Sequence, residues 1–252
     1  MSQANTPGLC FRQSPKRLAL SECRGLLIAL VIMAAWLCHL ELLLSIDLST
    51  AVHPAVILGA ILLQTFLNTG LFITAHDAIH GLVYPANRSV NAAIGALCAF
   101  SYASLPYKTL VTKHWLHHRY PMSAKDPDFC GLKQASFLTW YLHFMRQYWG
   151  WKQFIQLASA VGIVSFIFQL SPVNLVLFWA IPLLLSSLQL FYFGTYWPHQ
   201  NITTDYHQCA RSFPLPWFLS LLACYHFGYH QEHHEHPDIP WWGLPALHEA
   251  QH

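Results

Sequence analysis

Two short stretches of the chain carry histidines at the spacing of one helical face. His76 and His80 lie four residues apart, and His114 is followed at the third and fourth positions by His117 and His118. Side chains with this spacing have Cβ atoms about 5–6 Å apart on a helix, so each stretch directs several imidazoles to one point. Neutral imidazole is a ligand for zinc, copper and iron. Each stretch is therefore a candidate half of a metal site.

A third stretch, residues 225–237, is the richest in histidine. If it forms one helix, His226, His230 and His234 lie four residues apart on one face, with His233 beside them. His226 is in phase with His230, which favours a ligand over a core residue. The three stretches together hold more histidines than one four-coordinate ion needs. They indicate two metal ions held at one place.

His199 is one further expected ligand. It is isolated in sequence, but it lies just beyond an apolar segment, where a polar side chain is costly and usually functional. The alternative for the clusters is a histidine-rich surface that binds metal adventitiously. For lone histidines such as His39 and His143, a hydrogen-bonded core residue is the expectation. The ten candidate ligands are His76, His80, His114, His117, His118, His199, His226, His230, His233 and His234.

Three aspartates near the clusters have two interpretations. No Asp or Glu recurs at ligand spacing, so neutral imidazoles would leave the charge of two cations largely uncompensated. Carboxylates outside the ligand set are then expected to orient the ligands. Asp77, Asp126 and Asp128 are the candidates for this catalytic-site role. Helix capping and turn formation explain the same residues equally well.

Composition places these clusters in a membrane protein. The 252-residue chain is 54% hydrophobic and only 10% charged, with a mean hydropathy of +0.33. A soluble globular chain carries about 25% charged residues. The net charge of +2 is too small to indicate a nucleic-acid partner. The seven cysteines form no Cys-x-x-Cys pair and are expected to be free and reduced.

The apolar segments predict an all-α integral membrane protein with four transmembrane helices. A span takes about 20 residues. The expected spans are residues 25–46, 55–75, 155–170 and 173–193. Residues 90–107 fit a hairpin that dips into the membrane, and residues 137–154 fit an interfacial helix. We expect a cytosolic segment at 1–24, one catalytic domain at 25–247 and a short tail at 248–252.

Basic residues predict the orientation of these spans in the bilayer. The loops near 47–54 and 170–173 contain no Lys or Arg, so all 13 basic residues lie on the other side. By the positive-inside rule, that side is the cytosol. Both termini are then cytosolic. All three histidine stretches fall on the same side, at the membrane face.

The three histidine stretches resemble the histidine boxes of the membrane fatty-acid desaturase/hydroxylase superfamily. The boxes read H-x(3–4)-H, H-x(2–3)-HH and (H/Q)-x(2–3)-HH. Residues 191–199 and 224–237 narrow the resemblance to the bacterial and cyanobacterial beta-carotene ketolases. Residues 72–81, 113–118 and 126–128 add to it. The likeness runs from about residue 25 to residue 247.

This resemblance implies a site with two iron ions, molecular oxygen as co-substrate and reduced ferredoxin as electron donor. It also implies a carotenoid substrate whose ring C4 methylene becomes a ketone, so that beta-carotene gives echinenone and then canthaxanthin. Related enzymes differ in accepting 3-hydroxylated rings such as those of zeaxanthin, which lead to astaxanthin. From the residues alone, C–H oxidation needs a redox metal, and zinc is not one. The chain has no dinucleotide loop, haem motif or iron–sulfur pattern, so electrons come from another protein.

Two further residue sets have open assignments. Aromatic residues near the boxes are candidates to line a ring pocket, with packing against lipid as the alternative for each. They are Phe72, Tyr102, Trp115, Phe191 and Tyr225. A set of basic residues is a candidate docking surface for an acidic donor, although ordinary positive-inside charge explains it as well. It comprises Lys108, Lys113, Arg119, Lys125 and Lys133.

Two rival functions remain at this point. A carotenoid 3-hydroxylase, a fatty-acid desaturase or an alkane hydroxylase would carry the same three boxes. A metal transporter or metal-storage membrane protein would also be rich in histidine, but it would place the ligands along the spans near the middle of the bilayer. The positions predicted here gather at one membrane face, which favours an oxidase.

Overall fold

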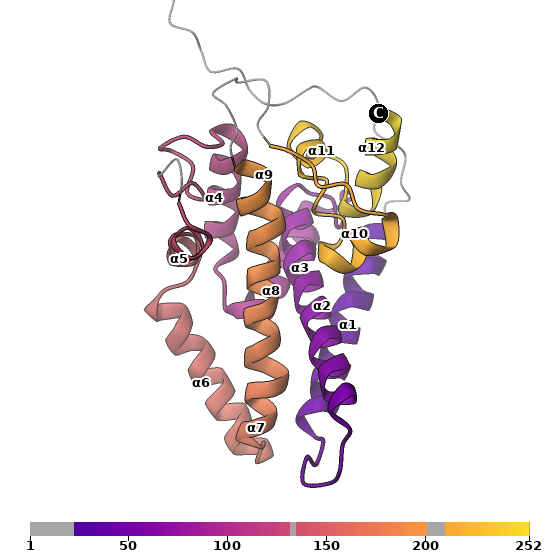
Figure 1. The fold of residues 1–252 in the computed structure, drawn as a ribbon, viewed down its shortest axis with the longest axis vertical. Coiled ribbons are helices and arrows are strands. Elements are labelled where there is room, and N and C mark those ends of the chain that lie inside the picture. The colour runs from indigo at the N-terminus through magenta and orange to yellow at the C-terminus, as the bar shows by residue number, and fades with distance from the viewer. Residues whose placement is uncertain (1–22, 132–134, 201–209, 252) are drawn as a thin grey trace, which may run out of the picture.

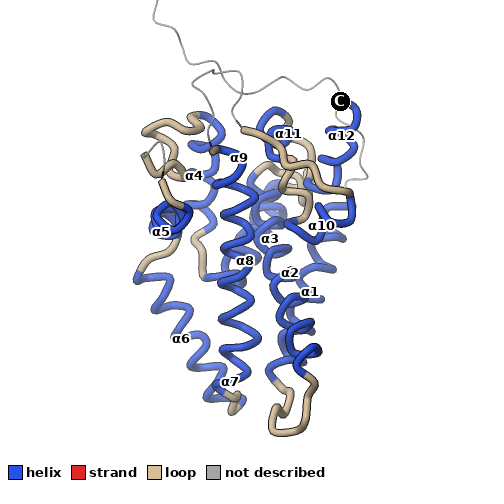
Figure 2. Tube along the Cα trace, viewed as in Figure 1, coloured by secondary structure: helices blue, strands red, loops and turns tan. Residues whose placement is uncertain are grey.

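The computed structural model describes residues 23–131, 135–200 and 210–251. Within these ranges every regular element is helical, and Figure 2 shows helices joined by loops. The predicted all-α class is therefore confirmed. The predicted cytosolic segment 1–24 lies outside the described residues, apart from its last two positions.

Four helical runs are long and apolar enough to cross a membrane, as predicted. They are α1 (Arg24–Leu44), α2 (Pro54–Ile79), α6 (Trp151–Phe168) and a composite run, Pro172–His199. In Figure 1, α1, α2 and α8 stand side by side, and α6 runs up and away from the hairpin turn at α7. The two loops that close the α1–α2 and α6–α7 hairpins lie together at the lower end of this view.

The composite run is one continuous helix that is interrupted by two π-helical stretches. It consists of α7 (Pro172–Leu175), η1 (Val176–Ala180), α8 (Ile181–Phe191), η2 (Tyr192–Tyr196) and α9 (Trp197–His199). The stretches η1 and η2 are π-helical, and each ends two residues before a proline, Pro182 or Pro198. Proline has no N–H to donate and its ring crowds the preceding turn, so a wider turn accommodates it. The helix therefore continues past the predicted end at residue 193 and carries His199.

Helix α2 is the central element that carries the first histidine pair. Its N-terminus follows the usual pattern, with Pro54 in the first turn and the His53 side chain accepting a hydrogen bond from the Ala55 N–H. Polar side chains along it are paired with neighbouring helices, as a membrane interior requires. Trp36 Nε1 donates to Asn68 Oδ1 at 2.7 Å, and His39 Nδ1 lies 2.7 Å from the Gln64 side-chain oxygen. The expected core role of His39 is thus confirmed.

Residues 90–107, predicted to form a membrane-dipping hairpin by themselves, form only one arm and the bend of a longer helical hairpin. Its arms are α3 (Arg88–Ala103) and α4 (Tyr107–Arg119), and its bend is at residues 104–106. The sequence interpretation ended the hairpin at Pro106. Pro106 is instead the residue that precedes α4, a position where proline is well tolerated. The returning arm is therefore α4, which carries the second histidine set.

Helix α3 packs closely against the end of α2. Asn91 donates to the Ala78 carbonyl at 2.7 Å and accepts from the backbone N–H of Val83 at 3.1 Å. A Cβ atom at Gly95 would lie 2.6 Å from the Ala78 Cβ and 2.6 Å from the Tyr107 ring. Only glycine permits this approach. The contact holds the last turn of α2, with its histidines, against α3 and α4.

The remaining helices are short and gather toward the upper end of Figure 1. They are α5 (Phe137–Tyr148), α10 (Trp217–Cys224), α11 (His230–Glu235), η3 (Trp241–Gly243) and α12 (Leu244–Gln251). The interfacial helix predicted over 137–154 ends at Tyr148, because Trp149 and Gly150 are extended and break it before α6. Helix α10, with 8 residues, is too short to span a bilayer.

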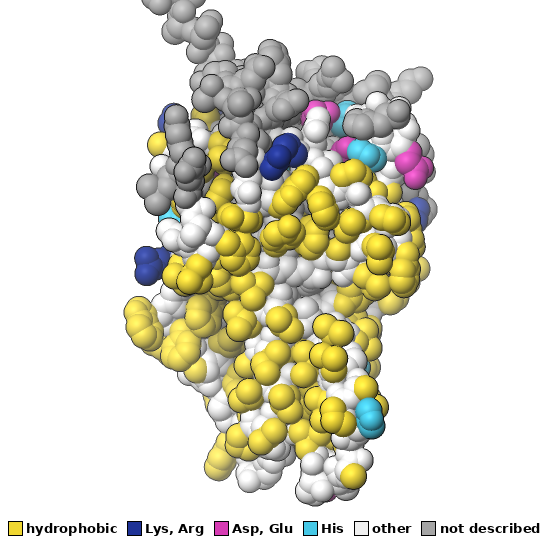
Figure 3. Space-filling model, in the orientation of Figure 1, with side chains coloured by type: hydrophobic (Ala, Val, Ile, Leu, Met, Phe, Trp, Pro, Cys, Tyr) yellow, Lys and Arg dark blue, Asp and Glu magenta, His cyan; other side chains and the backbone are white. Residues whose placement is uncertain are grey.

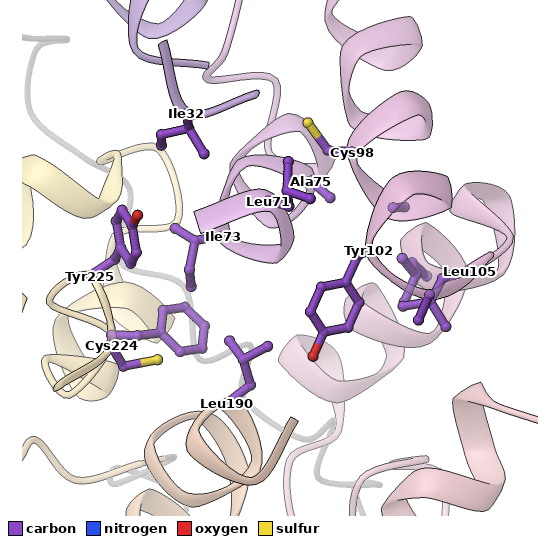
Figure 4. Packing of buried hydrophobic residues seen from close by; sticks show 14 residues of the cluster. Ile32, Leu71, Ile73, Ala75, Cys98, Tyr102, Leu105, Leu190, Cys224 and Tyr225 are labelled. Atoms are coloured by element: carbon purple, nitrogen blue, oxygen red, sulfur yellow. The ribbon is translucent and has the colours of Figure 1, made fainter. Parts of the chain in front are cut away.

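The surface and the core agree with a membrane protein that has one polar end. In Figure 3 hydrophobic side chains cover the body of the visible face, and charged side chains gather toward the top. Figure 4 shows the buried cluster around α2, where Leu71, Ile73 and Tyr225 lie between α1, α8 and the turn after α10. This packing fixes the polar end to the bundle.

Candidate metal centre

Five imidazoles from three helices form the first histidine group. Each offers one ring nitrogen, and these nitrogens all lie within 4.8 Å of one another. The members are His76 and His80 at the end of α2, His114 and His118 on α4, and His233 on α11. Several Nε2 atoms are in direct contact, at 2.8 Å between His80 and His114 and 3.1 Å between His76 and His233.

Four buried imidazoles form the second group, next to the first. They are His117 on α4, His199 on α9, and His230 and His234 on α11. Their ring nitrogens also lie within 4.8 Å of one another. The His117 and His118 rings are 6.0 Å apart, so neighbouring residues of α4 serve different groups. The nine side chains form two tight groups, and α4, α9 and α11, which carry seven of them, lie toward one end of the bundle (Figure 1). This argues against ligands spread along a transport path.

Hydrogen bonding alone does not account for the convergence of these nitrogens. The Nε2 of His234 lies 3.1 Å from the Nε2 atoms of both His117 and His230. The Nε2 of His118 lies 3.0 Å from those of both His114 and His233. One ring nitrogen carries either one N–H or one lone pair, so it serves only one such contact. A cation at the centre of each group would satisfy all its lone pairs together.

The protonation state of the rings fits metal binding. Burial lowers the pKa of His80 to about 3. Burial, together with the neighbouring histidines, lowers the pKa of His118 and of His234 well below the ordinary value. These three rings are therefore neutral at pH 7 and keep the lone pair that a metal ion requires. The donor set is thus suited to a transition metal.

In each group, the Nδ1 atom of one histidine faces a carboxylate. Asp77 Oδ1 is 3.2 Å from Nδ1 of His76, and both carboxylate oxygens of Asp126 are 3.1 Å from Nδ1 of His117. A proton held at Nδ1 leaves the lone pair on Nε2, which faces the group. Burial lowers the pKa of His117, but the charge of Asp126 raises it more, to about 9. Asp126 therefore makes this ring a stronger electron donor.

The two interpretations of the aspartates both fit the structure. Asp126 contacts His117 and also accepts hydrogen bonds from the backbone N–H groups of Met122 and Asp128, so it shapes the turn as well. Asp77 accepts from the backbone N–H of Trp241 at 3.2 Å. Although His117, Asp126 and Asp128 lie within 4.8 Å of one another, the ring presents Nδ1 to the carboxylates and Nε2 to His234. We interpret this third group as support for the ligand.

His226 belongs to neither group, so the helical argument for it is wrong. The stretch 225–237 is not one helix, because α10 and α11 are separated by a turn in which Tyr225 and His226 have φ of +49° and +61°. The His226 ring packs instead 5.2 Å from the Trp217 ring and 5.9 Å from the Trp241 ring. The helical spacing of His226 and His230 does not apply, because a turn separates the two residues.

Two supporting residues were not singled out from the sequence. Tyr148 donates a hydrogen bond to Asp128 at 2.5 Å, which links α5 to the loop beside His117. His248 Nδ1 lies 2.5 Å from the buried carboxylate of Glu232, which also accepts from the Ser212 hydroxyl. These contacts hold α11 against α12 and the segment before α10. Neither spacing nor composition signals such pairs.

A largely apolar cavity of about 400 Å³ lies beside the metal groups. Of the five predicted aromatics, Phe72 and Tyr102 line it. The other three do not: Phe191 is fully buried among aromatic rings, Tyr225 stacks on Phe66 at 4.3 Å, and Trp115 lies at the surface beside His80. These three residues therefore do not line this cavity.

A narrower pocket lies next to the cavity and is lined in part by histidines. It shares with the cavity four lining residues, Phe72, Phe144, Tyr148 and Leu190. Its other lining residues include His76, His114, His117 and His230. The cavity is thus adjacent to a pocket lined by histidines of both groups. The arrangement suits oxidation of an apolar substrate at one end.

Comparison with known proteins gives consistent results. Residues 52–161 and 149–252 match the fatty acid desaturase family. The beta-carotene ketolase of Paracoccus sp. strain N81106 is 40% identical over 220 residues, which cover 85% of this chain and 88% of that protein. The beta-carotene ketolase of Paracoccus sp. strain PC1 is 41% identical over 201 residues, which cover 79% of this chain and 81% of that protein. Beta-carotene 4-ketolase 3 of Haematococcus lacustris is 34% identical over 276 aligned positions, 97% of this chain and 84% of that protein.

Proposed function

The chain belongs to the fatty acid desaturase family, and within it we propose that this oxidoreductase is a beta-carotene 4-ketolase. One observation carries the proposal: two groups of imidazoles converge beside an apolar cavity. The substrate is a carotenoid with a β-ionone ring. Its C4 methylene becomes a ketone, giving echinenone and then canthaxanthin.

The proposed cofactor is a pair of iron ions, one in each histidine group. Iron held there supplies the oxygen-activating redox chemistry that side chains lack. Nine histidines hold the pair, five in one group and four in the other, because His226 is excluded. Asp77 and Asp126 keep the Nδ1 proton on His76 and His117, so the Nε2 lone pairs face the metals.

The proposed overall reaction consists of two hydroxylations at the same carbon. Each round takes up one O₂, two electrons and two protons. One oxygen atom enters the C4–H bond as a hydroxyl group and the other leaves as water. The geminal diol formed after the second round loses water to give the ketone. Reduced ferredoxin supplies the electrons.

The cavity accounts for a membrane-dissolved substrate. Its wall includes Leu157 and Val161 of α6, a helix with no buried residue. A long apolar molecule can therefore pass between α6 and α8 from the lipid. The polyene then occupies the cavity, and one ring passes Phe72 and Leu190 toward the histidines. The apolar walls exclude water from the reacting carbon.

The proposed topology puts both termini and the metal centre on the cytosolic side. The short loops at the opposite end, residues 45–53 and 169–171, contain no Lys or Arg. The positive-inside rule then assigns the basic end to the cytosol. This places the centre where a soluble electron donor can reach it.

Pigment analysis of cells that make beta-carotene or zeaxanthin tests this function. We expect the wild-type chain to produce echinenone and canthaxanthin from beta-carotene, and the zeaxanthin strain shows whether 3-hydroxylated rings are also accepted. His117→Ala should abolish ketone formation while the protein stays in the membrane fraction. Yellow 3-hydroxylated products would identify a hydroxylase instead, and wild-type echinenone yield from His117→Ala would refute the site.

A further inference from the structure

Helix α4 separates the five-histidine group from the outside of the molecule. Its exposed side chains follow helical spacing along one face. They are Lys108, Thr109, Thr112, Trp115, Leu116 and Arg119. The opposite face carries His114, His117 and His118 toward the metal groups. We call the exposed set the α4 face.

The Trp115 side chain is exposed at the surface of α4 and also contacts the five-histidine group. Its side chain is 39% exposed. Its ring centroid is 5.1 Å from that of His80 and 5.8 Å from that of His118, two members of the five-histidine group. By contrast, Phe227 contacts His76 and His233 but is only 5% exposed. Trp115 therefore offers an aromatic path from the surface to two candidate ligands.

The surroundings of Trp115 are basic. Lys108 and Arg119 lie on the α4 face, and Lys125 lies in the following loop. The Lys125 amine and the Arg119 guanidinium are 4.8 Å and 5.5 Å from the Tyr120 ring. Both carboxylates in the described residues 107–131, Asp126 and Asp128, are buried. A positive surface free of exposed carboxylates suits an acidic protein partner.

We propose that the α4 face docks an acidic iron–sulfur protein and that electrons pass through Trp115 to the five-histidine centre. This rests on the proposed ketolase function, which consumes two electrons per hydroxylation. Each docking transfers one electron: the reduced donor is oxidised and the ferric centre is reduced, without bond formation or cleavage. Electron tunnelling weakens with distance, and the Trp115 ring fills the gap between the donor and His80.

Anaerobic stopped-flow reduction of the iron-loaded protein in neutral-lipid nanodiscs tests the Trp115 step. The reductants are reduced plant-type [2Fe–2S] ferredoxin and, separately, dithionite with methyl viologen. We expect Trp115→Leu to slow reduction by ferredoxin about tenfold or more, with reduction by the small reductant and iron content unchanged. Trp115→Phe should restore most of the rate. The matched control is Trp151→Leu, the same substitution at a tryptophan of α6 that is 80% exposed and lies outside the α4 face, and it should have no effect.

Charge reversal tests the docking step. The double variant Lys108→Glu, Arg119→Glu should raise the ferredoxin concentration for half-maximal reduction about tenfold and weaken its salt dependence. Anionic lipid in the nanodisc should not change the wild-type rate. If the double variant keeps wild-type ferredoxin kinetics but loses affinity for anionic vesicles, the face contacts lipid headgroups and the docking proposal is wrong.

The remaining outcomes separate this proposal from the proposed function. Wild-type ferredoxin kinetics in Trp115→Leu would overturn it, and so would loss of iron or equal slowing with both reductants, because Trp115 would then only pack the ligands. Reduction is measured without a carotenoid. A wild-type chain that is reduced normally but forms no ketone would therefore contradict the ketolase assignment alone.

Discussion

At the scale of single residues, the site depends on which ring nitrogen carries a proton. His117 presents Nδ1 to Asp126 and Nε2 to His234, so one carboxylate decides the direction of the lone pair. Asp77 stands in the same relation to His76. Mutation of such partners, which are not ligands themselves, usually lowers metal affinity or activity by about 10- to 100-fold.

Asp126→Asn therefore should weaken iron binding and ketone formation by about 10- to 100-fold without removing a ligand. The change leaves the side chain in place but removes the charge that holds the His117 proton. Iron retention against a chelator and ketone yield measure the effect. Asp238→Asn, at an exposed carboxylate, is the control. Equal iron retention in the two variants would show that Asp126 only shapes the turn.

Residue spacing predicted the ligands on α2 and α4 but not every member of the site. His76, His80 and the α4 set lie on uninterrupted helices, so their phase could be read directly. His226 failed because the positive φ values of residues 225 and 226 break the phase, and sequence periodicity does not register them. The His248–Glu232 pair depends on how α12 folds back on α11, which no local pattern encodes.

At the scale of elements, close packing of α3 on α2 holds the first histidine pair in place. The apolar lengths of the spans were predictable, but this contact was not, because it depends on which two helices meet at Gly95. A methyl group there would overlap the Ala78 Cβ and the Tyr107 ring. Helix α2 ends one residue after Ala78, just before His80.

Gly95→Ala should lower the free energy of unfolding by about 1–3 kcal/mol, because overpacking outweighs the higher helix propensity of alanine. It should also weaken iron binding, since α3 moves away from the last turn of α2. Thermal unfolding in detergent and iron content are the measurements. The matched control is Gly59→Ala in α2, where a Cβ has no neighbour within 4 Å. Equal stability of both variants would contradict the packing argument.

Helix α6 forms one wall of the cavity proposed to hold the carotenoid, and mutations can test its inner and outer faces separately. Val161 lines the cavity, whereas Ile163 is 60% exposed on the outer surface. Val161→Trp should fill the cavity and lower ketone yield strongly with iron content unchanged. Ile163→Trp should be nearly neutral. Pigment yield per mole of enzyme measures both, and full activity of Val161→Trp would exclude this cavity as the carotenoid site.

At the scale of the whole molecule, the metal groups tie the polar end together. Four segments distant in sequence meet there: the end of α2, α4, α9 and α11. A ligand that binds only the folded state stabilises it by about 2.7 kcal/mol at 100 times its dissociation constant. Iron bound in the proposed centre should therefore stabilise the upper end of the bundle more than the apolar body.

Removing iron with a chelator should accordingly raise amide hydrogen exchange in α4 and α11, while the lower parts of α1 and α6 stay unchanged. The reason is that the proposed iron–histidine bonds, which link separate helices, lie only at the polar end. Exchange measured by mass spectrometry with and without iron tests this. A uniform increase along the chain, or none, would mean that the centre does not hold these segments together.

The most direct test of the central claim is the iron content of the purified protein and of two variants. The account predicts two iron ions per wild-type chain, two in His226→Ala, whose ring lies outside both groups, and one or none in His230→Ala. Fewer than two iron ions in the wild type, or equal iron loss in His226→Ala and His230→Ala, would contradict it.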